Sequence, residues 1–282
     1  MEGNLFSQTR KLLRQSGLKA RKGLGQHFLI SEKVLHNIIA AAELSPNDTV
    51  IEVGPGLGVL TRELATHAGR VIAIELDDNL AAKLREKLAD FKNVTIINDN
   101  VLNIDPQALL REHGLNSYKV VANLPYYITS PVLRHFLEAP LKPNIMVVMV
   151  QKEVARVITA EPGQRSVLSI AVQYYGNPKI AGYVPASAFH PAPKVDSAIL
   201  RIDLYPKPTV DVTDTASFFE VVRAGFAAPR KQIANSLAQG LDIPKEASLN
   251  ILEKAGIDPQ RRAETLTLEE WARLWHAREA AK

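Results

Sequence analysis

Four consecutive residues, Asn123, Leu124, Pro125 and Tyr126, carry groups that could act together on a planar, amino-bearing ligand. The Asn123 side-chain oxygen and the Leu124 carbonyl could accept hydrogen bonds from the two N–H bonds of one amino group. Pro125 has no N–H and a restricted φ, so it would hold the direction of the Leu124 carbonyl. Tyr126 offers a ring on which a base can stack. The pattern therefore predicts a binding site for a nucleobase.

The two acceptors also suggest a reaction. The amino nitrogen of adenine is a poor nucleophile because its lone pair is delocalised into the ring. Acceptors on both N–H bonds would draw that nitrogen toward pyramidal geometry and localise the pair, and alignment with a methyl donor would do the rest. No strong base is needed, because the methylated nitrogen is acidic. The alternative interpretation is a strand-ending turn with a buried tyrosine.

A glycine-rich loop, "EVGPGLGVLT" at residues 52–61, indicates the kind of cofactor. Glycines here would let the backbone approach a ligand. A dinucleotide fingerprint beginning at Gly54 and Gly56 needs a third glycine at position 59, which is Val59. The sequence also lacks the phosphate-binding G-x-x-x-x-G-K-[ST] pattern. A pyrophosphate-bearing cofactor is therefore disfavoured.

Polar residues follow the next two predicted strands. Glu75 ends one strand and could accept hydrogen bonds from both hydroxyls of a ribose. Asp99, followed by Asn100, ends the next and could take the amine of an adenine. Singly, each is typical of a turn former or helix cap. Together with the glycine loop they predict a nucleoside pocket without a phosphate, as S-adenosylmethionine requires.

These residues need a sheet whose strands end at one edge. Runs at 49–54, 70–76, 93–99, 118–124 and 144–150 read as strands, and 59–68, 79–91 and 131–139 read as helices. Such alternation predicts a parallel sheet with helices on both faces. Runs at 179–185 and 197–204 are too close for a crossover helix and are predicted to form an antiparallel edge pair. The fold class is α/β, Rossmann-like, with a helical C-terminal part.

The prolines of "YPKPTVD", at 205–211, predict a domain boundary, with one domain at 1–205 and a second at 206–282. The second reads as helical at 217–227, 231–241, 248–256 and 268–281. Gly256 is placed to cap a helix C-terminus. Thr267 with Glu270 fits a capping box.

Composition narrows the class of protein. The 282 residues include no cysteine, so a disulfide framework and a thiolate metal site are excluded, and no metal is expected. No apolar run is long enough to suggest a membrane helix, and the N-terminus lacks the apolar core of a signal peptide. We expect a cytoplasmic monomer that does not bind membranes.

The net charge of +4 is unevenly distributed. Residues 1–25 contain one acid, Glu2, and six basic residues: Arg10, Lys11, Arg14, Lys19, Arg21 and Lys22. Such an arm could neutralise RNA phosphates and make binding depend on salt. The alternative is a solvated terminal helix.

With these motifs in place, the chain resembles a known family. In order, "GLGQHFL", "EVGPGLGVLT", "VIAIELD", "NLPYYITSP", "QKEVARVI" and "FHPAPKVDSAILRI" are similar to segments of the ribosomal RNA adenine dimethyltransferases. The resemblance runs from about residue 10 to the end and is strongest to KsgA-type members. Those enzymes dimethylate two adjacent adenines near the 3′ end of small-subunit ribosomal RNA.

The resemblance implies a class I methyltransferase domain, a small helical domain and S-adenosylmethionine as cofactor. It implies that six residues touch the cofactor: His27, Leu29, Gly54, Glu75, Asp99 and Asn123. The roles of His27 and Leu29 come from the resemblance alone. In "APRKQIANSL", at 228–237, it suggests that Arg230 and Lys231 bind phosphate; the alternative is a solvated helix end.

One segment departs from the family pattern. The family usually has a tyrosine–glycine pair before a "LSV" motif, whereas "AEPGQRSVLSIAVQYY", at 160–175, is shorter and lacks it. We expect this loop near the mouth of the active site, where it would alter RNA docking.

Three other functions compete with this interpretation. They are dimethylation of large-subunit RNA, a non-catalytic RNA- or promoter-binding factor, and a nicotinamide-dependent dehydrogenase. The segments "PAPKVDSA" and "RKQIANSL" favour the small-subunit enzymes. The intact motif at 123–126 argues against lost catalysis, and Val59 argues against the dehydrogenase.

Overall fold

The computed structural model describes residues 26–281, which form two compact units. The first contains the described residues up to Ala155 together with Lys179–Leu204. The second contains Arg156–Pro178 and the described residues from Tyr205 onward. The basic arm at 1–25 lies outside the described residues. The division at residue 205 into two domains stays a prediction, but the chain does pass between the units at that point and also at 155–156 and 178–179.

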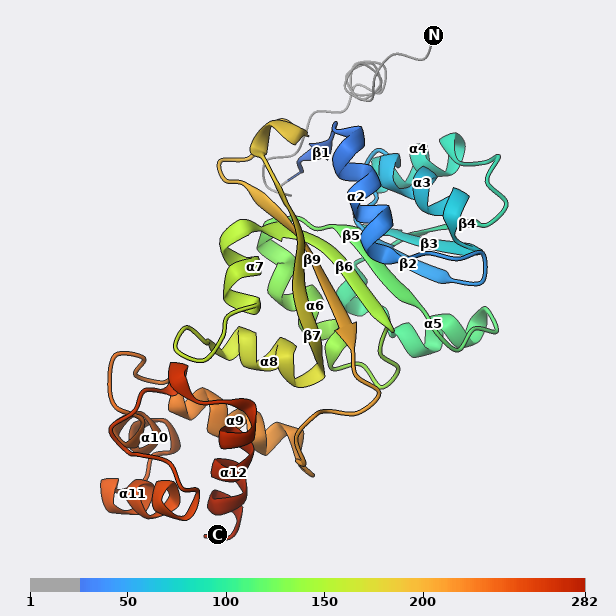
Figure 1. The fold of residues 1–282 in the computed structure, drawn as a ribbon. Helices are drawn as coiled ribbons and strands as arrows, with labels where there is room; N and C mark the ends of the chain where they lie inside the picture. Colours follow the sequence, from blue (N-terminus) through green and yellow to red (C-terminus); the bar gives the residue numbers. More distant parts are fainter. Residues whose placement is uncertain (1–25, 282) are drawn as a thin grey trace. The chain divides into compact units, whose positions relative to one another are not determined.

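A seven-stranded sheet organises the first unit (Figure 1). Its strand order is β4-β3-β2-β5-β6-β9-β7. The strands are β2 (Thr49–Val53), β3 (Arg70–Glu75), β4 (Val94–Asn98), β5 (Lys119–Asn123), β6 (Ile145–Gln151), β7 (Gly176–Val184) and β9 (Ser197–Leu204). Strands β2 to β6 pair in parallel and β9 pairs antiparallel with β6. The predicted mostly parallel sheet with an antiparallel edge is confirmed.

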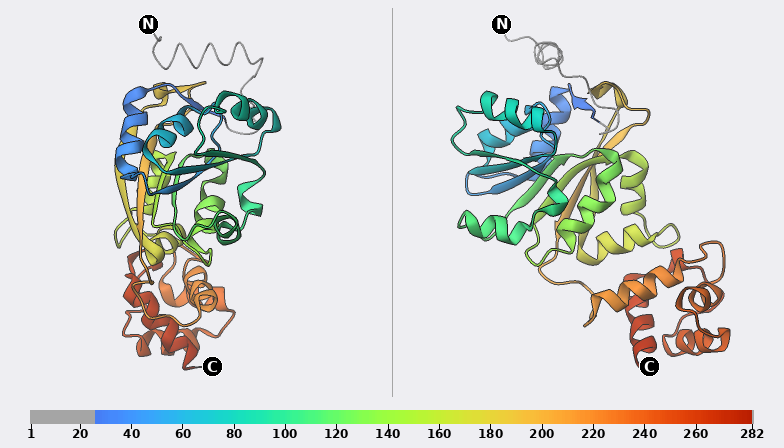
Figure 2. Two further views of the ribbon diagram at one scale, coloured as in Figure 1. Left: turned by 90° about the vertical axis from the view of Figure 1, so that its right-hand side faces the viewer. Right: turned by 180° about the vertical axis from the view of Figure 1, so that it is seen from behind.

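Helices lie on both sides of this sheet (Figure 2). They are α2 (Glu32–Ala42), α3 (Val59–His67), α4 (Asp78–Lys87), α5 (Pro106–Glu112), α6 (Thr129–Leu137) and α7 (Lys152–Ile158). One core cluster joins apolar residues of α2 and α3 to alternate residues of the strands, such as Val50, Val71 and Val121. The other residues of these strands, Ile51, Ile72 and Val120, are equally buried. Burial of both faces is expected for parallel strands covered by helices.

Two buried cations fasten the C-terminus of α2. Lys119 donates to the carbonyls of Ala42 and Glu43, at 3.2 and 2.7 Å, and pairs with Asp48. Arg201 donates to the carbonyl of Ala41 at 2.8 Å. The last carbonyls of a helix lack partners inside the helix, so these side chains satisfy them. They stand at the end of the sheet where β5 begins, opposite the strand ends that carry the predicted site.

A short strand pair ties the start of the described chain to a distant loop. Strand β1 (Phe28–Leu29) pairs antiparallel with β8 (Phe189–His190). The Ile30 N–H also donates to the Ala188 carbonyl at 2.9 Å, after the turn η4 (Ala186–Ala188). These bonds fix residues 27–30 against the sheet edge that holds the predicted site.

The second unit is helical. Its helices are α8 (Val167–Tyr175), α9 (Thr215–Gly225), α10 (Ile233–Leu241), α11 (Lys245–Lys254) and α12 (Leu268–Glu279). The rings of Tyr174 and Tyr175 in α8 pack against Phe218 and Phe219 of α9, with centroids 5.2 to 6.3 Å apart. This aromatic cluster explains why α8 belongs to the second unit, although strands β7 and β9 of the sheet follow it in sequence.

Helix ends in this unit match the sequence signals. Gly256 follows α11 with φ of +67°, a left-handed conformation that favours glycine. Thr267 and Glu270 form the reciprocal capping box at the start of α12. Some boundaries differ from expectation: α4 ends at Lys87 rather than at residue 91, and α10 begins at Ile233 rather than at 231.

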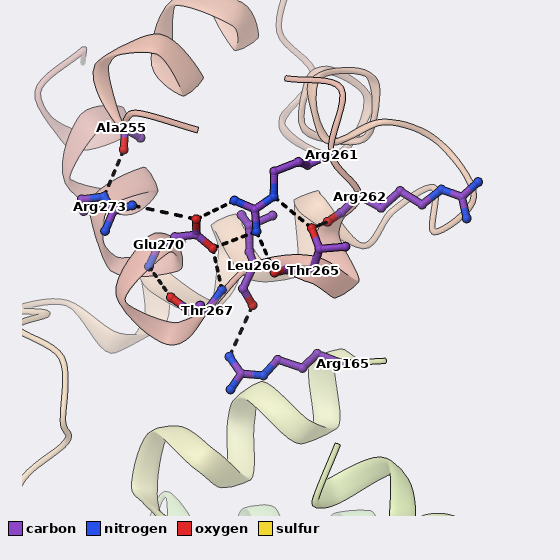
Figure 3. A network of polar contacts seen from close by, with 9 residues as sticks. All are labelled: Arg165, Ala255, Arg261, Arg262, Thr265, Leu266, Thr267, Glu270 and Arg273. Carbon is purple, nitrogen blue, oxygen red and sulfur yellow. Dashed lines mark hydrogen bonds and ion pairs between the residues drawn. The ribbon is translucent and has the colours of Figure 1, made fainter. Parts of the chain in front are cut away.

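The loop that departs from the family pattern is bound to the segment before α12 (Figure 3). The N–H groups of Gly163 and Arg165 donate to the Glu264 carbonyl at 2.8 and 3.4 Å, and the Arg165 guanidinium donates to the Leu266 carbonyl at 3.3 Å. Nearby, the two terminal guanidinium nitrogens of Arg261 each donate to one carboxylate oxygen of Glu270. A network within the second unit therefore holds the loop.

Candidate active site

The predicted site residues meet in one pocket at the carboxyl ends of β2, β3, β4 and β5. This pocket has about 230 Å³ of free volume. All eleven residues predicted for cofactor binding or catalysis line it: His27, Leu29, Gly54, Gly56, Glu75, Asp99, Asn100, Asn123, Leu124, Pro125 and Tyr126. Carboxyl ends of parallel strands share one edge of a sheet, so strand-ending polar residues that are far apart in sequence converge there.

The glycine loop turns sharply between β2 and α3. Gly54 and Gly56 have φ of +66° and +59°, values that residues other than glycine rarely adopt. A Cβ on Gly56 would also lie 3.3 Å from the Phe28 ring. The backbone conformation therefore favours glycine at position 56, and the close approach of β1 leaves little room for a larger side chain.

Glu75 is the best-anchored polar group of the pocket. Its carboxylate accepts hydrogen bonds from the N–H groups of Gly56 and Asp77, both at 3.0 Å. The side chain is only 6% exposed. Burial raises the pKa of Glu75, and the two N–H donors oppose that rise. A carboxylate held in this way keeps further lone pairs for a ligand.

Strand β4 ends at Asn98, one residue earlier than the sequence predicted, so Asp99 and Asn100 follow the strand directly. The Asp99 N–H donates to the Glu75 carbonyl at 3.1 Å, which links the two strand ends. The Asp99 carboxylate accepts from the Asn100 N–H at 2.6 Å. The side-chain oxygen of Asn100 accepts a hydrogen bond from the Leu102 N–H at 3.1 Å. Asp99 is exposed and lines the pocket.

The amide of Asn123 is oriented by β1. Its nitrogen donates to the His27 carbonyl at 3.0 Å. A carbonyl can only accept, so the nitrogen must point at His27 and the side-chain oxygen must point elsewhere. Within residues 26–281, neither that oxygen nor the Leu124 carbonyl accepts a hydrogen bond from the protein. Two adjacent acceptors thus remain for a ligand in the pocket.

Tyr126 is held from two sides. Its hydroxyl is 2.6 Å from the Ser197 hydroxyl at the start of β9. Its ring stacks on that of His27, with centroids 5.8 Å apart and planes 26° apart. The His27 ring is itself fixed by a 2.7 Å hydrogen bond to the Pro191 carbonyl. Pro125 has φ of −57° and ψ of 130°, which sets the turn that brings Tyr126 to these partners.

Sequence reasoning missed one acid in the pocket wall. Glu52, inside β2, is 1% exposed, and its Oε2 atom has no hydrogen-bond partner among the described residues. The buried hydroxyl of Thr61 acts against the effect of burial on the pKa of Glu52. Burial, reinforced by the charge of Glu75, raises the pKa of Glu52 to about 8. An acid interrupting the β-branched run "TVIEV" was the available signal.

The pocket contains acids but no strong base. Among the described lining residues, Glu52, Glu75 and Asp99 carry carboxyl groups, and neither lysine nor arginine occurs. Phe28, which the sequence analysis also missed, contributes an apolar wall, as do Leu76 and Val101. This described lining offers no lysine or arginine to a pyrophosphate. It suits a nucleoside that carries positive charge.

The predicted phosphate-binding residues lie elsewhere. Arg230 and Lys231 are both exposed in the turn before α10 of the second unit and do not line the pocket. Residues 160–166, expected near the active-site mouth, belong to the second unit, and their place at the mouth stays a prediction. In the part of the chain that the structure describes, no cluster of three or more His, Asp or Glu side chains could hold a metal ion. No helix of residues 26–281 is long and apolar enough to span a bilayer.

Comparison with known proteins agrees with this geometry. A family model described as ribosomal RNA adenine dimethylase matches residues 17–277. The chain is 52% identical over 271 residues to ribosomal RNA small subunit methyltransferase A of Dehalococcoides mccartyi, covering 96% of this chain and 92% of the relative. It is 46% identical to the protein of the same name from Pelotomaculum thermopropionicum, with 94% and 93% covered.

Two solved structures share the fold. The 23S rRNA methyltransferase ErmE is 31% identical with a TM-score of 0.70, covering 89% of this chain and 98% of that one. A dimethyladenosine transferase from Plasmodium falciparum has a TM-score of 0.76 at 24% identity, covering 88% and 96%. The class I methyltransferase architecture expected from the sequence is confirmed.

Proposed function

This chain belongs to the ribosomal RNA adenine dimethylase family, and from that premise we propose that it dimethylates N6 of two adjacent adenines near the 3′ end of small-subunit ribosomal RNA. The methyl donor in this proposal is S-adenosylmethionine. The RNA would be met in an assembling subunit, which places the enzyme in the cytoplasm. We further propose that it acts as a monomer.

Two observations support the small subunit rather than the large one. Relatives named as small-subunit enzymes are 51–53% identical to this chain over 271 residues. The large-subunit enzyme of known structure is 31% identical. Both groups share the fold and the adenine chemistry, so the choice between RNAs is made outside the pocket.

The pocket fits S-adenosylmethionine. Glycines at positive φ place bare backbone at its floor, the carboxyl groups of Glu75 and Asp99 line it, and no lysine or arginine of the described lining competes with a cationic ligand. The unpartnered Oε2 atom of Glu52 is a buried polar group of the kind that a polar ligand or ordered water satisfies. When bound, S-adenosylmethionine supplies a methyl group on a positively charged sulfur.

Each strand end would hold a different part of the cofactor. Glu75 would accept hydrogen bonds from the ribose hydroxyls, since its carboxylate is buried and anchored by backbone donors. Asp99 and Asn100 would bind the adenine amine. His27, Leu29, Gly54 and Gly56 would form the wall and floor around it, as expected from the family resemblance.

The observation that carries the proposal is the pair of acceptors at Asn123 and Leu124. The Asn123 nitrogen donates to the His27 carbonyl, so the side-chain oxygen keeps no protein donor among the described residues, and the Leu124 carbonyl in the same pocket lining is also unpaired. Both would accept from N6 of the target adenine, and this bonding strengthens as N6 becomes pyramidal. Tyr126, held by Ser197 and His27, would stack on the extruded base.

The test is single-turnover methylation of small-subunit RNA with labelled S-adenosylmethionine, followed by mass mapping of the product. Asn123→Ala should lower the rate about 10²- to 10³-fold, the usual cost of removing one preorganised transition-state partner, while most cofactor binding persists. Asn123→Asp keeps an acceptor and should retain partial activity. Asn250→Ala, at an exposed position of α11, is the matched control.

Two outcomes would contradict the proposal. Methylation confined to large-subunit RNA would overturn the substrate. Near-wild-type turnover in a folded Asn123→Ala protein would overturn the role of the acceptor pair.

A further inference from the structure

Strand β7 carries an aromatic side chain that the fold does not bury. Tyr183 is 57% exposed near the end of this edge strand, and its neighbour Val184 is fully buried. Alternate residues of β7 face solvent, and Tyr183 stands on that outer side. A tyrosine ring offers a large stacking surface at little conformational cost, because it has only two side-chain torsions.

A lysine stands over this ring. The Nζ atom of Lys152, the first residue of α7, lies 5.5 Å from the centroid of Tyr183. A cation over an aromatic face is attracted by the ring and holds its orientation. Lys152 forms no ion pair with a described carboxylate, so its charge is available to an anion. Ring and cation together match a nucleotide, which presents a flat base and a phosphate.

A series of contacts and strand pairings connects Lys152 to Tyr126, which would stack on the target adenine. The hydroxyl of Tyr126 contacts Ser197, and Ser197 is the register partner of Gln151 at the end of β6. Lys152 follows Gln151 directly, and its N–H donates to the Asp196 carbonyl at 3.0 Å. Lys152 therefore stands at the same edge of the sheet as the acceptor pair, while neither it nor Tyr183 lines the pocket.

We propose that Lys152 and Tyr183 form a second RNA subsite, which holds a nucleotide flanking the target adenine. The Tyr183 ring stacks on the flanking base, and Lys152 neutralises the adjoining phosphate. An extruded adenine leaves its neighbours unstacked, and a flanking platform stabilises that state. This subsite rests on the proposed function, because it presupposes a single-stranded RNA segment at the pocket.

Replacement of Tyr183 tests the stacking. Tyr183→Leu keeps an apolar side chain without a ring and should weaken binding of small-subunit RNA about 5- to 150-fold, from the stacking energy per base. Tyr183→Phe keeps the ring and should bind nearly as the wild type does. Lys152→Gln should lower the log–log salt slope of RNA binding by about 0.7, the value for one single-strand phosphate contact. Lys92→Gln, at an exposed position before β4, should leave the slope unchanged.

Cross-linking locates the subsite. A photoreactive phenylalanine at position 183 should cross-link to RNA within about two nucleotides of the methylated adenines. Cross-links confined to remote RNA, or none, would overturn the subsite, as would equal RNA affinity of the Tyr183→Leu and Tyr183→Phe proteins. Cofactor affinity should be the same in all variants. If the wild type fails to methylate the RNA, the proposed function fails and the subsite with it, whereas methylation with misplaced cross-links rejects the subsite alone.

Discussion

The buried acid Glu52 should make the stability of the first unit depend on pH in a direction unusual for a carboxyl group. Its side chain is 1% exposed, and burial together with the charge of Glu75 raises its pKa from 4.5 to about 8. Glu52→Gln keeps nearly the same shape and remains neutral at every pH. Comparison of the two proteins therefore isolates the ionisation of one group.

The sign follows from where the proton is bound. Below pH 4.5, Glu52 is protonated in both the folded and the unfolded chain, so it adds no pH dependence. Between pH 4.5 and about 8 the unfolded chain ionises while the folded chain stays protonated, so stability falls as pH rises. The slope is about 1.4 kcal/mol per pH unit, which gives about 3 kcal/mol at pH 7. Above pH 8 both states are ionised and the slope vanishes.

The measurement is urea unfolding at several pH values, followed by far-ultraviolet circular dichroism. Tryptophan fluorescence would report only on the second unit, because Trp271 and Trp275 both lie in α12. The free energy of unfolding of Glu52→Gln minus that of the wild type should increase steadily from pH 5 to pH 8. The buried amide adds a constant offset that does not affect this slope. A difference independent of pH would refute a raised pKa for Glu52.

Three further changes have expected outcomes. Glu75→Ala should weaken S-adenosylmethionine binding about 10- to 150-fold, from the loss of charge-assisted hydrogen bonds; unchanged affinity by calorimetry in a folded variant would remove Glu75 from the cofactor site, and Glu75→Gln, which keeps an acceptor for one N–H group, should lose less. Neutralising the six basic residues of the arm at 1–25 should lower RNA affinity and reduce the log–log salt slope by about 0.7–0.9 per lost phosphate contact, with cofactor affinity unaltered; an unchanged slope would identify the arm as solvated surface. Gly240→Ala should lower the stability of the second unit by about 1–3 kcal/mol, because a Cβ there would overlap the backbone of Ala224 in α9; an unchanged midpoint by tryptophan fluorescence would mean that α9 and α10 can separate without cost.

Residues at the ends of strands were the part of the site that sequence could predict. Glu75 and Asn123 each interrupt an apolar run at its carboxyl end, a local signal, and parallel topology then brings such ends together. The same logic missed Glu52, because that acid stands one residue before the end of β2 and not at its end. It also missed Phe28, which approaches Gly56 from β1, a strand that pairs with β8 about 160 residues later in the chain.

The grouping of helices was equally beyond local signals. The sequence placed the end of the first domain at the prolines near residue 205. The aromatic packing of Tyr174 on Phe218 and the bond from Arg165 to Leu266 instead draw the segment 156–178 into the second compact unit. These contacts join residues that are 44 and 101 positions apart in the sequence. Side-chain packing over such separations leaves no periodic pattern of apolar residues in the sequence.

The pairing of β1 with β8 has a consequence for the protein while it is being made. Every residue that lines the pocket has been synthesised by Ile128. The partners that orient His27 and Tyr126, namely β8, Pro191 and Ser197, are still to come. A nascent chain that has emerged only to the end of β6 therefore holds the parts of a methylating centre in an unfinished arrangement. The contacts that orient His27 and Tyr126 can therefore form only after the residues of β8 and the start of β9, which pairs antiparallel with β6, have been synthesised.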